Sequence, residues 1–490
     1  MENKKNDVIS ARRKIVGFFD EDVYATIGIV AYNRLDVTEL CVKSVLENTK
    51  DINYKLVLVY NENEQGKGIL EYFNSIEYEN KVVVHIKQNA GAPFAYQQIQ
   101  KHIEGRYFVH LPNDVIVTPN WLSNLIKCAE SDDRIGMVNP VSSNVSNLQC
   151  VDLEFSSYEE MQKKAAEYNV SDSLKWQERL RLITLGTLLT RECLLAIGTI
   201  FDCGFMHDFG DDDLSFRVRR AGYKIILAAD TWVHHNHNMN ERNPEQFNNS
   251  IAIGKENFYN KYYGIDAWED VNNYVSSYIQ NNIEMPNDFE DVNILGIDVK
   301  CGTPVLDIKN IIRQYNVSDP CINSFSTDSK YYMDLKTICD GQVVCDRIDF
   351  LYNSFKANNF DYIIIGQNIN EYSQPESVVR DAYALLKPGG EMFVSLKNTY
   401  NIFTLLESLG YDIGCNETAR HYKLESFCQN ILNMGIKIEL INQEFYAVDK
   451  TVDDYVLNIV KQFKADDNKE ALIYHKLKVK NYWLKIKKNV

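Results

Sequence analysis

The chain has 490 residues, which exceeds the roughly 100 to 200 residues of one ordinary domain and excludes a single hydrophobic core. A formal net charge of −16, with 45% hydrophobic and 24% charged residues, is an ordinary globular composition and disfavours nucleic-acid binding by overall surface charge. Eleven cysteines without a C-x-x-C pair disfavour a disulfide framework or a zinc finger, and no apolar run reaches about 18 residues, so we expect a cytoplasmic protein.

The first part of the chain alternates apolar runs with helical stretches. We expect four of these runs to form strands, at residues 24–33, 55–61, 81–89 and 106–114. Short apolar strands separated by helices predict a parallel, doubly wound α/β sheet. Such a sheet binds ligands at the carboxyl ends of its strands. Because each run ends on polar residues, the sequence predicts a binding site along one edge of this sheet.

A second alternation follows and predicts another, smaller α/β sheet. Its expected strands are 293–299, 360–366 and 391–396, and its expected helices are 375–386 and 400–409. The whole chain is then predicted to comprise an N-terminal extension at 1–23, a first α/β domain at 24–260, a helical connector at 261–291, a second α/β domain at 292–450 and a basic C-terminal tail at 451–490.

The end of the chain differs in charge from the rest. From Lys461 to Val490 it carries nine lysines against three acidic residues. One interpretation is a peripheral attachment to the inner face of the cell membrane or to a complex of partner proteins. The other, which we favour, is a terminal helix or strand whose apolar side packs on the second domain while the lysines stay in water.

Carboxylates and histidines in the first domain carry the chemistry. Asp114 ends a predicted strand, and a carboxylate there is a hard oxygen ligand for Mg²⁺ or Mn²⁺. His234 or His235 could add a ligand, with His237 in reserve. The run Asp211–Asp213 crowds like charges, which raises at least one pKa and suits a general base. The alternative for this run is a solvated acidic turn at the start of a helix.

Four motifs follow one another along the first domain: A-Y-N-R at Ala31–Arg34, N-x-G at Asn89–Gly91, P-N-D at Pro112–Asp114 and G-D-D-D-L at Gly210–Leu214. In this order and spacing, residues 24–260 resemble the family 2 glycosyltransferases of the GT-A fold. The resemblance implies a metal site at Asp114 and His234, and a catalytic base at Asp211, or at Asp212 if the register shifts by one residue. The donor-binding residues that it implies are Ala31, Tyr32, Asn33, Arg34, Asn61, Asn89, Gly91, Asn113 and Asp114. The chain departs from the family at Pro112, in place of the first Asp of D-x-D, and at Tyr60-Asn61, where an Asp usually reads the nucleotide base.

The implied function is that of an inverting, metal-dependent glycosyltransferase. Mn²⁺ or Mg²⁺ is the expected cofactor, a UDP-linked sugar the expected donor, and a hydroxyl of a bacterial surface glycan or of a protein such as flagellin the expected acceptor. Nucleic acid is not an expected partner. A non-catalytic assembly factor of a glycosylation complex is an alternative, since Tyr60 stands at the position of the missing Asp.

Residues 292 to about 400 resemble a class I S-adenosylmethionine-dependent methyltransferase, a Rossmann-like α/β domain. The similarity is clearest from Phe360 through the turn at Lys387–Gly390. In the first strand-loop, however, Lys300 and Pro304 occupy positions where that family has glycine. Side-chain bulk and a fixed φ would crowd the cofactor there. We therefore expect a degenerate domain that does not bind S-adenosylmethionine, and keep a bifunctional glycosyltransferase and methyltransferase as the alternative.

Overall fold

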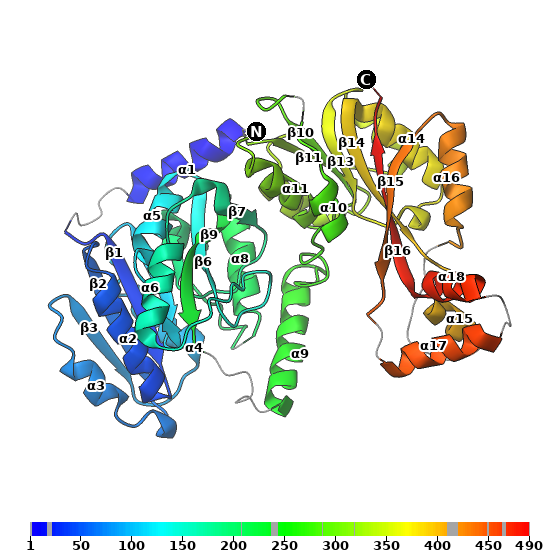
Figure 1. The fold of residues 1–490 in the computed structure, drawn as a ribbon. Coiled ribbons are helices and arrows are strands. Elements are labelled where there is room, and N and C mark those ends of the chain that lie inside the picture. The colour runs from blue at the N-terminus through cyan, green and yellow to red at the C-terminus, as the bar shows by residue number, and fades with distance from the viewer. Residues whose placement is uncertain are drawn as a thin grey trace. The chain divides into compact units, whose positions relative to one another are not determined.

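The computed structural model describes residues 2–16, 22–206, 208–236, 244–286, 288–317, 319–408, 420–447, 450–462 and 467–489. Two compact units divide the chain (Figure 1). The first comprises Met1–Asn273 with Lys336–Ile338, and the second comprises Tyr274–Leu335 with Cys339–Val490. Each unit is built on its own sheet covered by helices, so the predicted α/β class with two sheets is confirmed.

The sheet of the first unit has the strand order β3-β2-β1-β4-β8-β6-β9-β5, with β7 paired to β9, among the described residues. Its parallel strands β1 (Ala25–Ala31), β2 (Tyr54–Asn61), β3 (Lys81–Ile86) and β4 (Tyr107–Pro112) confirm the four predicted strands. The remaining strands are β5 (Val115–Ile116), β6 (Ile135–Ser142), β7 (Trp176–Arg179), β8 (Thr187–Thr190) and β9 (Lys224–His235). The helices are α1 (Glu2–Val16), α2 (Leu35–Asn48), α3 (Ile69–Ser75), α4 (Ala92–Gln100), α5 (Trp121–Glu130), α6 (Tyr158–Tyr168), α7 (Arg191–Ile197), α8 (Gly210–Arg220) and α9 (Pro244–Lys261).

Both faces of this sheet are buried, as expected for parallel strands flanked by helices. Ile27 and Ile29 point into one apolar cluster, which also contains residues of α2 and α3, and Val30 points into the other, which also contains residues of α4. Gly28 permits the close approach of α4, since a Cβ at this position would lie 2.8 Å from side-chain carbons of Ile99. The period-2 pattern of β1 therefore places helices on both faces.

Two predicted boundary segments belong to the first unit. In the N-terminal extension, α1 buries Ile9 in the core and donates from the guanidinium of Arg12 to the carbonyl of Ala221 at 2.6 Å. In the predicted connector, Trp268 stacks on Phe209 with ring centroids 4.9 Å apart. The connector is also not mainly helical, because only α10 (Ser277–Asn282) follows α9 before the second sheet begins. Its aromatic side chains pack on the first unit and thereby hold residues up to 273 there.

The second unit has the strand order β12-β11-β10-β13-β14-β16-β15 among its described residues. The parallel strands are β10 (Asn293–Ile297), β11 (Cys321–Ser326), β12 (Val343–Cys345), β13 (Phe360–Ile365) and β14 (Leu386–Lys397). Its helices are α10, α11 (Thr303–Arg313), α12 (Tyr332–Ile338), α13 (Leu351–Ser354), α14 (Pro375–Leu385), α15 (Ile402–Ser408), α16 (Leu424–Asn433), α17 (Lys450–Gln462) and α18 (Asp467–Lys478). The three predicted strands and both predicted helices are present, and Lys387–Gly390 lies near the start of β14, where the register with β13 shifts and Gly389 has a φ of 81°.

The predicted C-terminal tail is not a tail. Its strand β16 (Val479–Lys487) runs antiparallel between β14 and β15 (Ile438–Phe445), with Leu484 and Ile486 in the core of the second unit. The packed interpretation of this segment is therefore the correct one. No helix within the described residues is long and apolar enough to cross a membrane.

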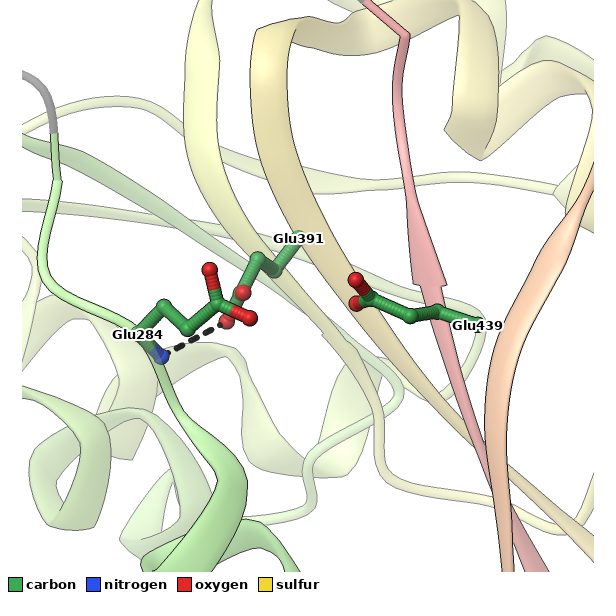
Figure 2. A group of neighbouring side chains, drawn as sticks. All are labelled: Glu284, Glu391 and Glu439. Carbon is green, nitrogen blue, oxygen red and sulfur yellow. Dashed lines mark hydrogen bonds between the residues drawn. The ribbon is translucent and has the colours of Figure 1, made fainter.

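Three glutamates converge on one lysine of β16. Figure 2 shows the carboxylates of Glu284, Glu391 and Glu439, which follow α10 or lie on β14 and β15. The ammonium of Lys485 contacts them at 2.6, 2.7 and 3.4 Å, respectively. Burial raises the pKa of the Glu391 carboxyl, which Lys485 opposes by favouring the ionised form. Because the lysine already supplies the cation, this carboxylate group is a structural ion cluster.

We expect Lys485→Met to lower the free energy of unfolding of the second unit by about 3–5 kcal/mol, because it leaves the buried Glu391 without its cation. Lys487→Met is the matched control, since Lys487 contacts Glu284 at 2.5 Å from a side chain that is 35% exposed, and should cost less than about 1 kcal/mol. Calorimetry would resolve the transition of the second unit from that of the first. Equal effects of the two substitutions would contradict this assignment.

Candidate functional site

The predicted donor-binding residues gather at one edge of the first sheet. In the parallel register, Ala31 lies beside Tyr60, Asn61 beside Ile86, and Val30 beside Pro112. The strands β1 to β4 therefore end at the same level. Asn61 is the last residue of β2, and the loops that follow the strands carry Tyr32, Asn33, Arg34, Asn89, Gly91, Asn113 and Asp114. Ala31 itself is fully buried in the core, so its side chain does not reach this edge.

Asn61 holds the loop that follows β3. Its side-chain amide donates to Oδ1 of Asn89 at 2.8 Å, and its own Oδ1 accepts from the backbone N–H of Ala90 at 3.0 Å. Asn89 Oδ1 also accepts from the backbone N–H of Gly91 at 3.0 Å. Gly91 has a φ of 82°, a conformation that favours glycine. Asn61 is only 2% exposed, so in this structure it braces the 89–91 loop.

Asn113 and Arg34 shape the loop that follows β1. The Asn113 amide donates to Oγ1 of Thr38 at 2.9 Å and to the carbonyl of Asn33 at 3.4 Å. Arg34 forms a two-pronged ion pair with Asp36, with both N–O distances 3.0 Å. Tyr32 stays 41% exposed. The polar residues of this loop thus brace one another, and Tyr32 offers its ring to the outside.

Asp114 lies beside His235. The antiparallel pairing of β5 with β9 sets Val115 opposite His235, and Nε2 of His235 lies 3.4 Å from Oδ2 of Asp114. Nδ1 of the same ring lies 3.1 Å from the carbonyl oxygen of Asn144, which can only accept. The proton of the neutral ring therefore belongs on Nδ1, and the Nε2 lone pair faces Asp114.

His234 occupies a different environment from the one predicted for a metal ligand. Its Nδ1 lies 2.7 Å from Oγ of Ser143, and its ring packs edge-on against Phe155 at 5.1 Å. Burial lowers the pKa of His234 to about 4, so the ring is neutral at physiological pH. Of the two neighbouring histidines, it is His235 that the structure brings to Asp114. His237 lies outside the described residues.

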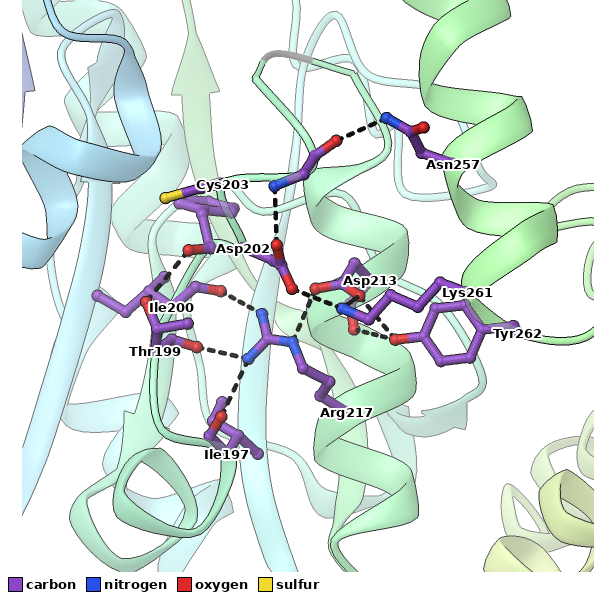
Figure 3. A network of polar contacts seen from close by, with 12 residues as sticks. Ile197, Thr199, Ile200, Asp202, Cys203, Asp213, Arg217, Asn257, Lys261 and Tyr262 are labelled. Carbon is purple, nitrogen blue, oxygen red and sulfur yellow. Dashed lines mark hydrogen bonds and ion pairs between the residues drawn. The ribbon is translucent and has the colours of Figure 1, made fainter.

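The acidic run opens helix α8, and its three carboxylates have different partners. Asp213 accepts from Nε of Arg217 at 2.7 Å, from Nζ of Lys261 at 2.5 Å and from the hydroxyl of Tyr262 at 2.7 Å. Figure 3 shows how this network continues, since Arg217 also donates to the carbonyls of Thr199 and Ile200. Asp213 is therefore a structural anchor that connects α8 to α9 and to the loop that precedes α8.

Asp212 and Asp211 complete the run. Asp212 forms a buried ion pair with Nε of Arg181. Asp211 instead accepts a hydrogen bond at 2.5 Å from the neutral hydroxyl of Thr184 and remains partly accessible to solvent. Burial raises the pKa of Asp211 to about 6, and the charge of Asp212 adds to the increase. Since Asp212 and Asp213 are buried, the interpretation as a solvated acidic turn is wrong.

Tyr96 on α4 relates the two carboxylates that carry the predicted chemistry. Burial raises the pKa of Tyr96 well above its usual value, and the charges of both Asp114 and Asp211 add to the increase. Asp114 and Asp211 therefore both lie within electrostatic reach of the buried Tyr96 hydroxyl. Sequence reasoning missed Arg181 and Thr184, since neither stands in a recognisable motif.

Comparison with known proteins agrees with this architecture. Residues 26–177 match the family model described as Glycosyl transferase family 2, a range that includes Asp114 but not Asp211 or His235. The strand order, the helices on both faces and this match define the first unit as a GT-A-like glycosyltransferase domain. No curated protein matches the chain.

Similar solved structures overlap only part of the chain. GalNAc-T7 with UDP, GalNAc and Mn²⁺ is 16% identical over 44% of this chain and 44% of its own, with a TM-score of 0.35. The mannosyltransferase PcManGT from Pyrobaculum calidifontis, in complex with GDP-Man and Mn²⁺, is 14% identical over 54% of this chain and 74% of its own, with a TM-score of 0.37. A putative methyltransferase from Bacillus halodurans is 12% identical over 44% of this chain and 98% of its own, with a TM-score of 0.29. These likenesses are too partial to assign a substrate.

The different partners of the acidic run predict opposite effects on stability. Because the pKa of Asp211 rises from 3.8 to about 6 on folding, its ionised form costs stability that is fully felt above pH 6 and is absent at low pH. Asp211→Asn should therefore raise the free energy of unfolding of the first unit by about 1–3 kcal/mol at pH 8 and by much less at pH 4. Denaturant unfolding at both pH values measures this.

Asp212→Asn is the matched comparison in the same helical turn. It leaves Arg181 buried without its carboxylate and should lower the free energy of unfolding by about 3–5 kcal/mol at pH 8. Stabilisation by both substitutions, or by neither, would mean that the two carboxylates are not distinguished in this way.

Proposed function

We propose that the first unit transfers a sugar from a nucleotide-sugar donor to an acceptor hydroxyl, with inversion at the anomeric carbon. The observation that carries this proposal is the selective pairing of the acidic run. Arg181 pairs with Asp212, and Arg217 and Lys261 pair with Asp213, whereas Asp211 keeps a neutral partner and some access to solvent. A carboxylate with a pKa of about 6 is ionised at neutral pH and basic enough to accept a proton.

The proposed step is a single displacement. The acceptor oxygen attacks the anomeric carbon while the bond from that carbon to the diphosphate oxygen breaks. Asp211 accepts the hydroxyl proton, and the nucleoside diphosphate leaves with the bonding electrons. Asp212 is less suited to this role, because its carboxylate is tied to Arg181 inside the protein.

A divalent cation fits the pair of Asp114 and His235. A carboxylate oxygen, which is a hard donor, and an imidazole nitrogen, which is a softer one, lie 3.4 Å apart and together could hold Mn²⁺ or Mg²⁺. The hydrogen bond to the Asn144 carbonyl orients the ring for this purpose. A bound cation would neutralise charge on the departing diphosphate. We therefore propose His235 as the histidine ligand in place of His234.

The identity of the substrates extends the proposal further. The family resemblance supports a UDP-linked donor and an acceptor hydroxyl on a surface glycan or on a protein such as flagellin. In the structure, the side-chain amide of Asn61 is hydrogen-bonded to the 89–91 loop. We therefore propose that Asn61 supports donor binding by shaping that loop. Tyr32, exposed at the same edge, is a side chain that could contact the nucleotide.

We propose that the second unit does not bind S-adenosylmethionine. The strand order β12-β11-β10-β13-β14 reverses direction at β10, which is where such a sheet binds its ligand. There, Asp298 accepts from the backbone N–H of Thr327 at 2.6 Å and from the hydroxyl of Tyr372 at 2.6 Å. Asp298 and Tyr372 are 8% and 6% exposed. The position is thus filled by the chain's own side chains, so we propose a scaffold role for this unit.

We expect Asp211→Asn to lower kcat by about 10²- to 10⁴-fold, because the amide cannot accept the acceptor proton. The measurement is release of nucleoside diphosphate from a panel of nucleotide sugars with Mn²⁺. Donor affinity should change little, and the exposed Asp152→Asn serves as the surface control. Full activity of Asp211→Asn would refute the assignment of the base, and no turnover of any donor by the wild type would favour the assembly-factor alternative.

The metal ligands give a separate prediction. His235→Ala should weaken Mn²⁺ binding in the presence of nucleoside diphosphate by about 10-fold or more, because it removes the Nε2 donor beside Asp114. His234→Phe, which fills the same aromatic pocket, should leave Mn²⁺ affinity within about 3-fold. Paramagnetic resonance of free Mn²⁺ reports both. A larger loss with His234→Phe would restore His234 as the ligand.

A further inference from the structure

The segment before β8 is joined residue by residue to helix α8. Arg181 pairs with Asp212, the backbone N–H of Leu182 donates to Oγ of Ser215 at 3.2 Å, and Thr184 donates to Asp211. These contacts come from residues 181–184, one short segment without regular secondary structure. The segment is therefore held against α8 along its length, and Thr184 at its end lies beside Asp211.

The other side of the segment is fixed to the interior of the sheet. The backbone N–H of Ile183 donates to Oε1 of Gln149 at 2.8 Å, and the Ile183 carbonyl accepts from Nε2 of Gln149 at 3.0 Å and from the amide of Asn139. Gln149 and Asn139 are 1% and 0% exposed. Thr184, which follows directly, is itself 5% exposed and has little freedom to turn away. Its hydroxyl is therefore held in place before any substrate arrives.

A fixed neutral donor has a definite effect on a carboxylate. It occupies one oxygen, Oδ1 of Asp211, and fixes the plane of the group, so that Oδ2 has a defined direction. It also favours the ionised form without the cancellation of charge that Arg181 imposes on Asp212. A base needs this combination of a charged, oriented and reactive oxygen.

We propose that Thr184 is a positioning residue for the catalytic base, presenting Oδ2 of Asp211 to the acceptor hydroxyl through its hydrogen bond to Oδ1. This inference rests on the proposed function, since it takes Asp211 to be the base. Thr184 does not contact the reacting atoms and acts through Asp211 alone. The hydroxyl, not the methyl group, is the part of the side chain that matters.

The effect of the Thr184 hydroxyl on Asp211 can be distinguished from the effects of the charged groups around it. Burial and the charge of Asp212 raise the pKa of Asp211, whereas the Thr184 hydroxyl, the charge of Arg181 and the backbone N–H of Thr184, which substitution of the side chain leaves in place, lower it. Tyr96 on α4 lies within electrostatic reach and is neutral, since its own pKa is raised well above its usual value. Removing the hydroxyl alone should therefore move the titration of Asp211 upward while Arg181, Asp212 and Tyr96 stay in place.

The experiment compares the pH dependence of kcat/KM for wild type, Thr184→Val, Thr184→Ala and Thr184→Ser. In Thr184→Val and Thr184→Ala we expect the acidic limb to move up by about 1 to 2 pH units and kcat to fall about 10-fold or more at neutral pH, with KM for the donor unchanged. Thr184→Ser keeps the hydroxyl and should retain the wild-type limb. Thr184→Ala introduces no apolar methyl group in place of the hydroxyl and serves if Thr184→Val does not fold.

The outcomes are distinct. An unchanged acidic limb in Thr184→Val and Thr184→Ala, or a shift in Thr184→Ser as large as theirs, overturns the inference. Asp211→Asn is measured in parallel: if it loses activity while the limb of Thr184→Val stays in place, the inference fails and the proposed function stands. If Asp211→Asn keeps full activity, the assignment of Asp211 as the base fails and the inference fails with it, whereas the proposed function fails if the wild type turns over no donor.

Discussion

The first unit depends on how three adjacent carboxylates are neutralised at the start of one helix. Asp211, Asp212 and Asp213 would repel one another strongly if all three were buried and ionised without partners. Arg181 on one side and Arg217 with Lys261 on the other supply the cations for the second and third. The negative charges also lie in the first turn of α8, where the helix dipole favours them. The helix can therefore begin with three acidic residues and still be packed.

The same pairing organises the chain around the site. Arg217 reaches the carbonyls of residues 199 and 200, Lys261 also contacts Asp202, and Tyr262 packs on Phe216. In this way one carboxylate holds together α8, α9 and the loop before α8, as Figure 3 shows. Burial of the ionised Asp211 carboxylate lowers the stability of the unit. The contacts of Asp213 stabilise the same end of α8 and offset this loss, as is common where a protein retains a poorly stabilised group. The acidic run thus comprises two carboxylates that anchor the helix through ion pairs and one, Asp211, that accepts from a neutral hydroxyl.

Much of this arrangement follows from local sequence patterns, and part of it does not. The four strand ends were predictable because apolar runs that stop on Asn or Asp mark both the strand and its polar edge. The choice between His234 and His235 was not, because adjacent strand residues point to opposite faces and only the pairing of β5 with β9 decides which one meets Asp114. Arg181 and Thr184 were missed because their partners lie about thirty residues away, on α8. The sequence predicts that the apolar side of the C-terminal segment packs on the second domain, but not that the segment enters the sheet, because its pairing partners lie on β14 and β15.

Lys485 shows why net charge was a poor guide to that strand. A lysine is usually a surface group, yet the side chain of Lys485 is only 4% exposed. It contacts three glutamates, one from the segment after α10 and one from each of the neighbouring strands β14 and β15. A buried lysine is tolerable only when its charge is matched, and the matching residues belong to elements far apart in sequence. The cluster therefore specifies β16 as the strand between β14 and β15, because another strand in that place would leave Glu391 buried without a cation. In both units, then, a buried ion pair selects which segment pairs with which, and in the first unit it also leaves Asp211 as the carboxylate with a neutral partner.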